Sequence, residues 1–451
     1  MRSYLPDMAK VQCAKLSAGA MLLATILQTQ AWSASGKMLE FSVRPPAVES
    51  SPSTPYTLSV YLSPSLLSAS ALGSRVDRDF SSGRVKRVAI EEKSSRDDSI
   101  YAPLALRVAE LENRKMIDGV MARIGQSPSS PPPAILDHIF SVDSGTSGSI
   151  DRREQEGRVI FSHGPRILAE YDTEGTAVSS SVMSHLATFL CHEYGLHPKI
   201  LAEIASLGYI PREIVVCLQE PSESRHTLTL TGVRDSSPPE PMPPLPPPSD
   251  RVYGLSSRAS SMSREEVQAR HATILEEATR YADAGRNLDS MLMLLSYGAC
   301  TGKTPDSLPA LKEKIGGDPE VISLLELVNP TDAQSAREAL VKLESLGSES
   351  EPARAMLKLF QANITAALGN PAAASELFLG ALEIEPTMSS AWFDLGAVFH
   401  TSFDTHSAWR CYDAGKALSP VHPAAKEIGS VEQGLRTSHP RFFNGLGQPG
   451  G

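Results

Sequence analysis

A repeat with an offset of 34 residues in the C-terminal part of the chain constrains the fold more than any other feature. Small, aromatic and proline residues recur at this offset, as expected for paired helices that approach closely and stack on the next pair. Such pairs bury their apolar faces only when stacked, so the repeat predicts an all-helical array. The matched pairs are Ala362 and Gly396, Ala374 and Ala408, Phe378 and Tyr412, Ala381 and Gly415, and Pro386 and Pro420.

Capping residues and prolines indicate where the second helix of each pair begins and ends. Asn370 and Asp404 precede it at matching positions, and their side chains are suited to capping a helix N-terminus. Pro386 and Pro420 are expected to end it.

The second copy of the repeat, residues 389–422, resembles the tetratricopeptide repeat (TPR) family. The positions that match the family signature are Trp392-x-x-Leu395-Gly396-x-x-Phe399, Ala408-x-x-x-Tyr412-x-x-Gly415 and Pro420. The first copy, 355–388, matches mainly in its second helix, because Lys358, Gln361 and Thr365 stand where the family has large apolar residues. Upstream, residues 263–346 are interpreted as two degenerate helical hairpins, and downstream the apolar stripe of Ile428, Val431 and Leu435 predicts a terminal capping helix.

The resemblance implies a concave groove, lined by the first helix of each pair, that binds a protein or peptide. Leu359 and Asp394 stand where family members that clamp a carboxylate have basic residues, so an apolar or basic peptide is expected instead. Alternatively, the apolar members only pack against neighbouring helices. The residues expected to line the groove are Leu359, Phe360, Asn363, Phe393, Asp394 and His400.

A proline-rich run, 236–248, marks the clearest boundary because it suits neither a helix interior nor a sheet ladder. We therefore divide the chain into 37–235, a Pro/Ser-rich linker at 236–262, and a TPR-like helical domain at 263–439. The predicted fold class is an α+β N-terminal domain followed by an all-α helical-hairpin (TPR-like) solenoid.

Residues 37–235 mix strand and helix patterns. Two stretches, 63–82 and 125–157, are rich in Ser, Pro, Gly and charge, and are predicted to be long loops or partly disordered. Strands are expected at 39–43, 56–62, 85–90, 159–162 and 227–233, and helices at 104–124, 178–191 and after Pro198.

The first 35 residues have the order of a signal peptide, with basic residues, an apolar run at 16–27 and then small residues. The run is too short for a membrane span, which needs about 20 residues. Export to the periplasm or medium is therefore expected. The start at Met1 or Met8, and cleavage after Ala31 or Ser33, stay open.

Removal of that segment would leave four cysteines, Cys191, Cys217, Cys300 and Cys411. They allow three disulfide connectivities, or they are isolated buried thiols.

Two strings resemble catalytic motifs. Residues 298–304 (GACTGKT) have one residue too few between their glycines for a phosphate-binding loop, and they follow a helical segment, so a helix-ending loop is preferred. His192 and His197 are five residues apart, one more than a zinc-protease helix uses. A helix end is again preferred, with a metal site as the alternative.

No catalytic, cofactor or metal residues are assigned from the sequence. A net charge of −10 disfavours nonspecific nucleic-acid binding. We interpret the chain as an exported adaptor or assembly factor without enzymatic activity. The alternatives are an extracytoplasmic, possibly metal-dependent hydrolase with its site in 37–235, and a structural subunit of an envelope assembly.

Overall fold

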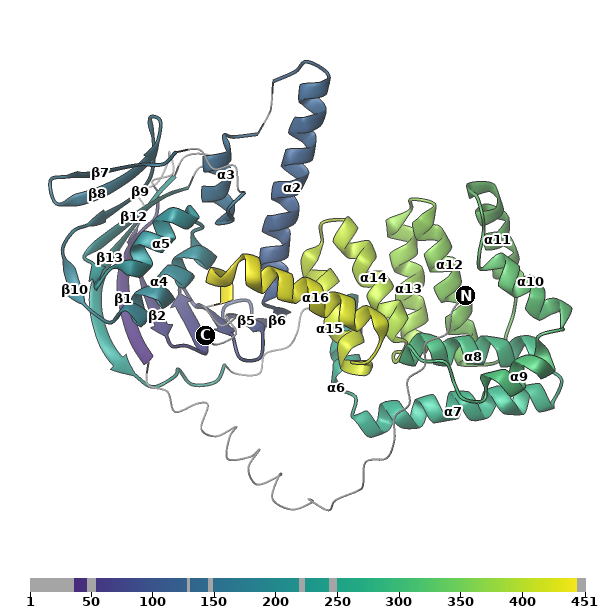
Figure 1. Cartoon of the computed structure of the whole chain (residues 1–451). Helices are drawn as coiled ribbons and strands as arrows, with labels where there is room; N and C mark the ends of the chain where they lie inside the picture. Colours follow the sequence, from purple (N-terminus) through teal and green to yellow (C-terminus); the bar gives the residue numbers. More distant parts are fainter. Residues whose placement is uncertain are drawn as a thin grey trace, which may run out of the picture.

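The computed structural model describes residues 36–46, 54–127, 130–144, 149–218, 224–242 and 250–443 (Figure 1). It contains an N-terminal antiparallel sheet domain followed by an all-helical region, which confirms the predicted fold class. The predicted signal peptide lies outside the described residues.

The N-terminal domain is built on one sheet of eleven strands in the order β6-β5-β4-β3-β2-β1-β13-β12-β9-β8-β7. A short pair, β10 and β11, lies apart from it. The strands are β1 (Gly36–Arg44), β2 (Tyr56–Leu62), β3 (Leu66–Ala71), β4 (Ser74–Asp79), β5 (Arg84–Ala89), β6 (Ser94–Ser99), β7 (Asp151–Gln155), β8 (Arg158–His163), β9 (Arg166–Asp172), β10 (Gly175–Ala177), β11 (Tyr209–Pro211), β12 (Glu213–Leu218) and β13 (Ser224–Ser236).

The prediction of a long loop at 63–82 was wrong, because β3 and β4 occupy most of it. Strand β3 consists of Leu, Ser and Ala, and β4 consists mostly of Ser, Arg and Asp, so neither shows a strong strand pattern in the sequence. An antiparallel strand needs only one apolar face, which Leu67 and Ala69 supply on β3. The stretch 125–157 likewise contains a helix, α3, and strand β7.

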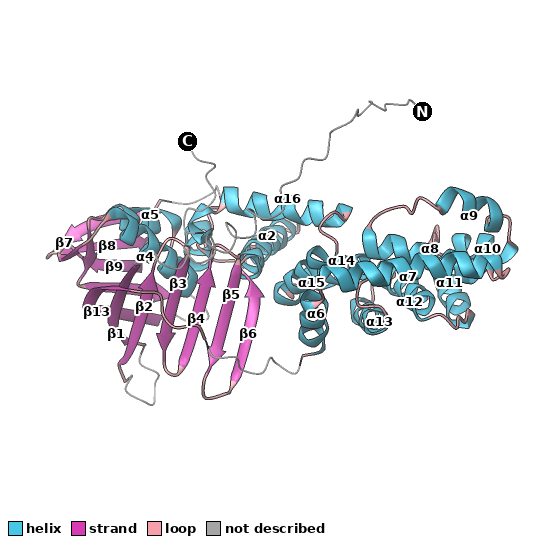
Figure 2. Cartoon of the chain, turned by 90° about the horizontal axis from the view of Figure 1, so that it is seen from below, coloured by secondary structure: helices cyan, strands magenta, loops and turns pink. Residues whose placement is uncertain are grey.

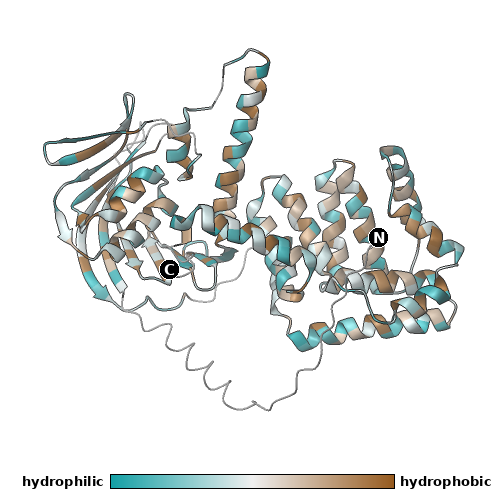
Figure 3. Cartoon of the chain, in the orientation of Figure 1, coloured by the Kyte–Doolittle hydropathy of each residue, from teal (hydrophilic) through white to brown (hydrophobic). Residues whose placement is uncertain are grey.

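Four helices cover one face of this sheet (Figure 2). They are α2 (Tyr101–Arg123), α3 (Pro133–Phe140), α4 (Ser180–Glu193) and α5 (Pro198–Ser206). The free end of α2 projects from the body (Figure 1), and hydrophobic residues continue along it (Figure 3). Of these, Met116, Ile117 and Val120 are exposed.

The helical region starts earlier than predicted. Helix α6 (Arg251–Ser261) falls within the predicted linker, and Asp250 caps it by accepting from the amides of Val252 and Tyr253. The other elements are α7 (Arg264–Asp283), α8 (Asn287–Thr301), α9 (Leu308–Ile315), α10 (Pro319–Leu327), α11 (Ala333–Ser345), α12 (Glu351–Ala367), α13 (Pro371–Ile384), α14 (Ser389–Thr401), α15 (Thr405–Leu418), α16 (Pro423–Ser438) and the 3₁₀ turn η1 (Pro440–Phe443).

Helices α12 and α13, and α14 and α15, form the two hairpins of the repeat (Figure 1). A Cβ on Gly396 would lie 2.4 Å from the ring of Tyr412, so only glycine allows α14 and α15 to come this close. The predicted caps are confirmed: Asn370 accepts from the amide of Ala373, and Asp404 from that of Ser407.

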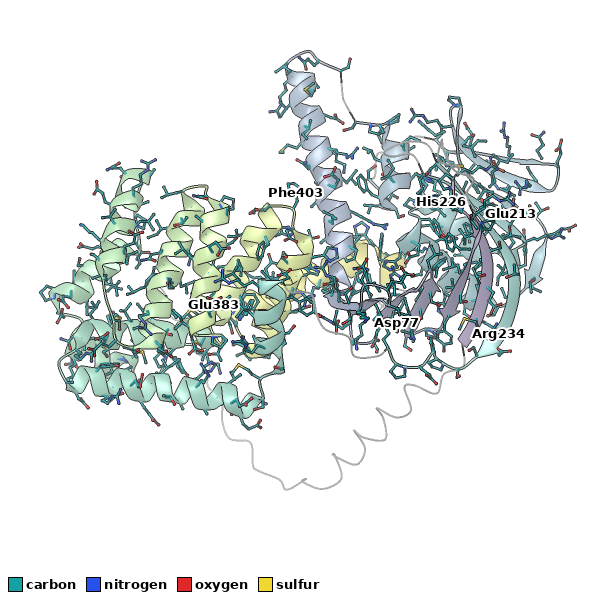
Figure 4. The ribbon with its side chains drawn as sticks, turned by 180° about the vertical axis from the view of Figure 1, so that it is seen from behind. Asp77, Glu213, His226, Arg234, Glu383 and Phe403 are labelled. Atoms are coloured by element: carbon teal, nitrogen blue, oxygen red, sulfur yellow. The ribbon has the colours of Figure 1, made fainter. Side chains whose placement is uncertain are left out.

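The turns of the two hairpins have different residues at their left-handed position. Gly369 in the first turn and Phe403 in the second both have left-handed backbones, with φ of 79° and 61°. Phe403 is 44% exposed on the turn between α14 and α15 (Figure 4). The glycine adopts this conformation freely, whereas the phenylalanine is strained by about 1 kcal/mol or more.

The two parts of the chain share a core. Trp409 and Tyr412 from α15, and Phe442 and Phe443 from η1, belong to the hydrophobic cluster of the sheet domain. Ion pairs cross the same boundary. Arg84 of β5 contacts Asp413 at 2.6 Å, and Arg410 contacts Asp98 of β6 at 2.6 Å.

Helix α16 also belongs to this boundary. Ile428 and Leu435 of its apolar stripe pack against the sheet-domain cluster, whereas Val431 is exposed. The helix therefore docks the array on the sheet domain as well as ending it.

Candidate functional site

A cavity of about 410 Å³ lies between α8, the α8–α9 loop, α12 and α14. This volume is within the range of ligand pockets in proteins. Its apolar wall includes Met291, Leu294, Leu295, Met356 and Leu359, and its polar lining includes Lys303, Thr304, Asn363, Ser390 and Asp394.

The spacing of these residues along α12 and α14 places their side chains on the helix faces that line the cavity. Met356, Leu359 and Asn363 are three and four residues apart, so they share one face of α12. Ser390 and Asp394 share a face of α14 in the same way. Helix α8 packs across both helices and closes the space from the other side.

Asp394 is the acidic group of the cavity. Its carboxylate accepts one hydrogen bond, 3.3 Å long, from the side-chain amide of Asn363. Burial raises the pKa of Asp394 above its ordinary value, and the Asn363 bond opposes this only in part. Within the described part of the chain, no cation lies within ion-pair distance of this carboxylate.

The rim of the cavity is the string that resembled a phosphate-binding loop. Helix α8 ends there at Gly302, which has a φ of 68°. The amide of Gly302 donates to the Gly298 carbonyl and that of Lys303 to the Thr301 hydroxyl, so neither points at a ligand. The predicted helix-ending loop is therefore confirmed.

The six residues expected to line a groove separate into two groups. Leu359, Asn363 and Asp394 line the cavity. The other three do not. Phe393 is buried against Gly415 and His422, Phe360 is a half-buried member of the array core, and the exposed His400 stacks on Trp409 at 6.1 Å.

The sequence did not indicate the contribution of α8. Residues 263–346 were expected to form two degenerate helical hairpins. Helices α7 and α8 do pack together as a hairpin, but α8 also crosses α12 and α14, and α9, α10 and α11 follow it. The apolar character of α8, with Met291, Leu294 and Leu295, was the only available signal.

A serine–histidine pair borders the cavity. The Ser390 hydroxyl lies 3.0 Å from Nε2 of His422, while Nδ1 of His422 accepts from the Ala424 amide. In a neutral ring this places the proton on Nε2, so His422 donates to Ser390. A general base needs the opposite arrangement.

The second catalytic-like string, 192–197, has structural contacts. Nε2 of His192 donates to the carbonyl of Phe442, and Glu193 pairs with Arg78. His197 caps α5 by accepting from the Lys199 amide. No group of three potential metal ligands occurs among the residues that the structure describes.

Arg107 of α2 holds the same end of α4. Its guanidinium donates to the carbonyls of Cys191 and His192 and lies over the ring of Phe442, 5.2 Å from the ring centre. A positive charge at a helix C-terminus interacts favourably with the helix dipole. The segment around His192 therefore anchors the C-terminal turn.

None of the four cysteines that the structure describes forms a disulfide, and all four are buried. Burial raises the pKa of the Cys191 thiol to about 11, and it also raises the pKa of Cys300 and Cys411. These thiols are thus poor nucleophiles at neutral pH.

Comparison of the chain with protein-family models finds no match, and neither does comparison with curated proteins. Among the described residues, no helix has both the length and the apolar character that crossing a membrane requires.

Proposed function

We propose that this chain is an exported TPR-containing adaptor or assembly factor that binds a protein or peptide and has no catalytic activity. The observation that carries the proposal is the cavity between α8, α12 and α14, which combines an apolar wall with a few polar groups. The first helices of both repeat hairpins contribute to it, as the family resemblance implies.

The two groups of residues that resemble catalytic sites also support a binding role. The Ser390–His422 pair has the wrong proton arrangement for a nucleophile, and His192 and Glu193 are engaged in structural contacts. The shared core between the sheet domain and the array gives the cavity a rigid support, which lowers the entropic cost of binding.

Screening the full purified chain against a library of synthetic peptides tests the proposal. Leu295→Glu places a charge in the cavity wall and is expected to abolish binding. Val341→Glu, at an exposed apolar site on α11, is the matched control and should bind like the native chain. If no peptide binds, or if both variants lose binding equally, the proposal is wrong.

Export is tested separately. The N-terminal residue of the protein recovered from its native host should be Trp32 or Ala34 if the segment before it is a cleaved signal peptide. A chain that retains residues 16–27 would contradict this part of the proposal.

A further inference from the structure

We propose that the cavity selects a peptide segment in which a large aliphatic side chain lies next to a lysine or arginine, with Asp394 binding the cation. This inference rests on the proposed function and specifies its ligand. Its two parts come from the acidic group and the apolar wall of the same cavity.

Asp394 supplies the site for the cation. A carboxylate has acceptor positions for about four hydrogen bonds, and among the residues that the structure describes only Asn363 donates one to it. A partly desolvated carboxylate without a counter-charge is unfavourable. An ammonium or guanidinium group of the ligand that donates hydrogen bonds to Asp394 would therefore stabilise the carboxylate. An acidic ligand group would be repelled at the same place.

The wall supplies the site for the aliphatic side chain. Met291, Leu294, Leu295, Met356 and Leu359 carry unbranched or γ-branched chains and no rings. Methionine side chains adapt to ligands of different shape. Burying one leucine or isoleucine in such a wall contributes about 1.5–3 kcal/mol.

Lys303 lines the same cavity and would oppose a cationic ligand, so its effect has to be weighed against that of Asp394. Lys303 is exposed on the α8–α9 loop, whereas Asp394 is half-buried. The ammonium group of an exposed lysine extends into the solvent, where its charge is screened, whereas a partly buried charge is screened much less. The acidic group therefore dominates the selection.

The test uses synthetic peptides with a fixed leucine followed by lysine, arginine, norleucine or glutamate, added to the full chain. We expect the lysine and arginine peptides to bind at least about tenfold more tightly than the norleucine peptide, because charged hydrogen bonds contribute more than neutral contacts. Asp394→Asn should remove that preference while leaving the norleucine affinity unchanged. Glu427→Gln, at an exposed carboxylate on α16, is the control and should change neither.

The outcomes separate this inference from the proposed function. If peptides bind and Leu295→Glu abolishes binding, but lysine and norleucine peptides bind equally, the inference is wrong and the proposed function stands. A lysine preference that survives Asp394→Asn also overturns it. If no peptide binds, both proposals fail.

Discussion

Nε2 of His192 donates a hydrogen bond, 3.0 Å long, to the carbonyl oxygen of Phe442, which lies 250 residues further along the chain. The rings of the two residues also meet edge to face, with centroids 5.3 Å apart. This contact fixes the end of the helical array to α4 of the sheet domain. The string that resembled a zinc-protease helix thus has a structural role in joining the two parts.

Truncation of the C-terminal anchor should loosen this connection. Phe442 is 1% exposed, and Phe442→Ala removes its packing against His192 and Arg107, with an expected loss of about 3–5 kcal/mol in unfolding free energy. Val431→Ala, at an exposed site on the neighbouring helix α16, should cost less than about 0.5 kcal/mol. Denaturant unfolding measures both, and equal stability of the two variants would contradict the anchor.

Acid should destabilise the sheet domain below the ordinary pKa of histidine. Burial lowers the pKa of His138 and of His197 from 6.5 to about 4, and burial also lowers that of His192. Between pH 6.5 and pH 4 these histidines are protonated in the unfolded chain but not in the folded chain. The free energy of unfolding is therefore retained above pH 6.5 and decreases as the pH falls below it.

For His138 alone the loss at pH 5 is about 2 kcal/mol. Unfolding measured from pH 7 to pH 5 should show this decline, and His138→Gln should make it shallower. A stability that stays constant over this range would show that these rings accept protons in the folded state.

Glycine substitutions should separate a packing role from helix propensity. Gly396→Ala places a methyl group 2.4 Å from the Tyr412 ring and should destabilise the array by about 1–3 kcal/mol. Gly434→Ala, on α16 with open space around it, should instead stabilise by about 0.5–1 kcal/mol. Opposite signs in thermal unfolding support close packing of α14 and α15, and the same sign would argue against it.

The strained turn gives a further prediction. Phe403→Asn keeps a side chain but suits the left-handed backbone, so we expect a gain of about 0.5–1 kcal/mol in unfolding free energy. Thermal unfolding measures the gain. A loss of stability would mean that the exposed ring makes contacts that outweigh its strain.

The hairpins of the array could be predicted because their spacing is local. Gly396, Gly415, Asn370 and Asp404 each have a contact or cap that follows from their position in the repeat. Strand β2 was likewise predicted because its apolar alternation is clear. In these cases, neighbouring residues alone determine the structure.

Other features depend on contacts between distant segments. Strands β4 and β6 consist largely of Ser, Arg and Asp, and they form because neighbouring strands pair with them. The crossing of α8 over α12 and α14 depends on three-dimensional packing, which periodicity does not encode. For this reason half of the candidate cavity, and the true surroundings of Phe393, were missed.

The most direct test of the binding cavity is nuclear magnetic resonance of the full chain labelled at methionine methyl groups. Met291 and Met356 line the cavity, and Met183 is fully buried in the sheet domain. Adding a leucine–lysine peptide should shift the methyl resonances of Met291 and Met356 and leave that of Met183 unchanged. If the peptide binds and leaves Met291 and Met356 unaffected, the cavity is not the binding site.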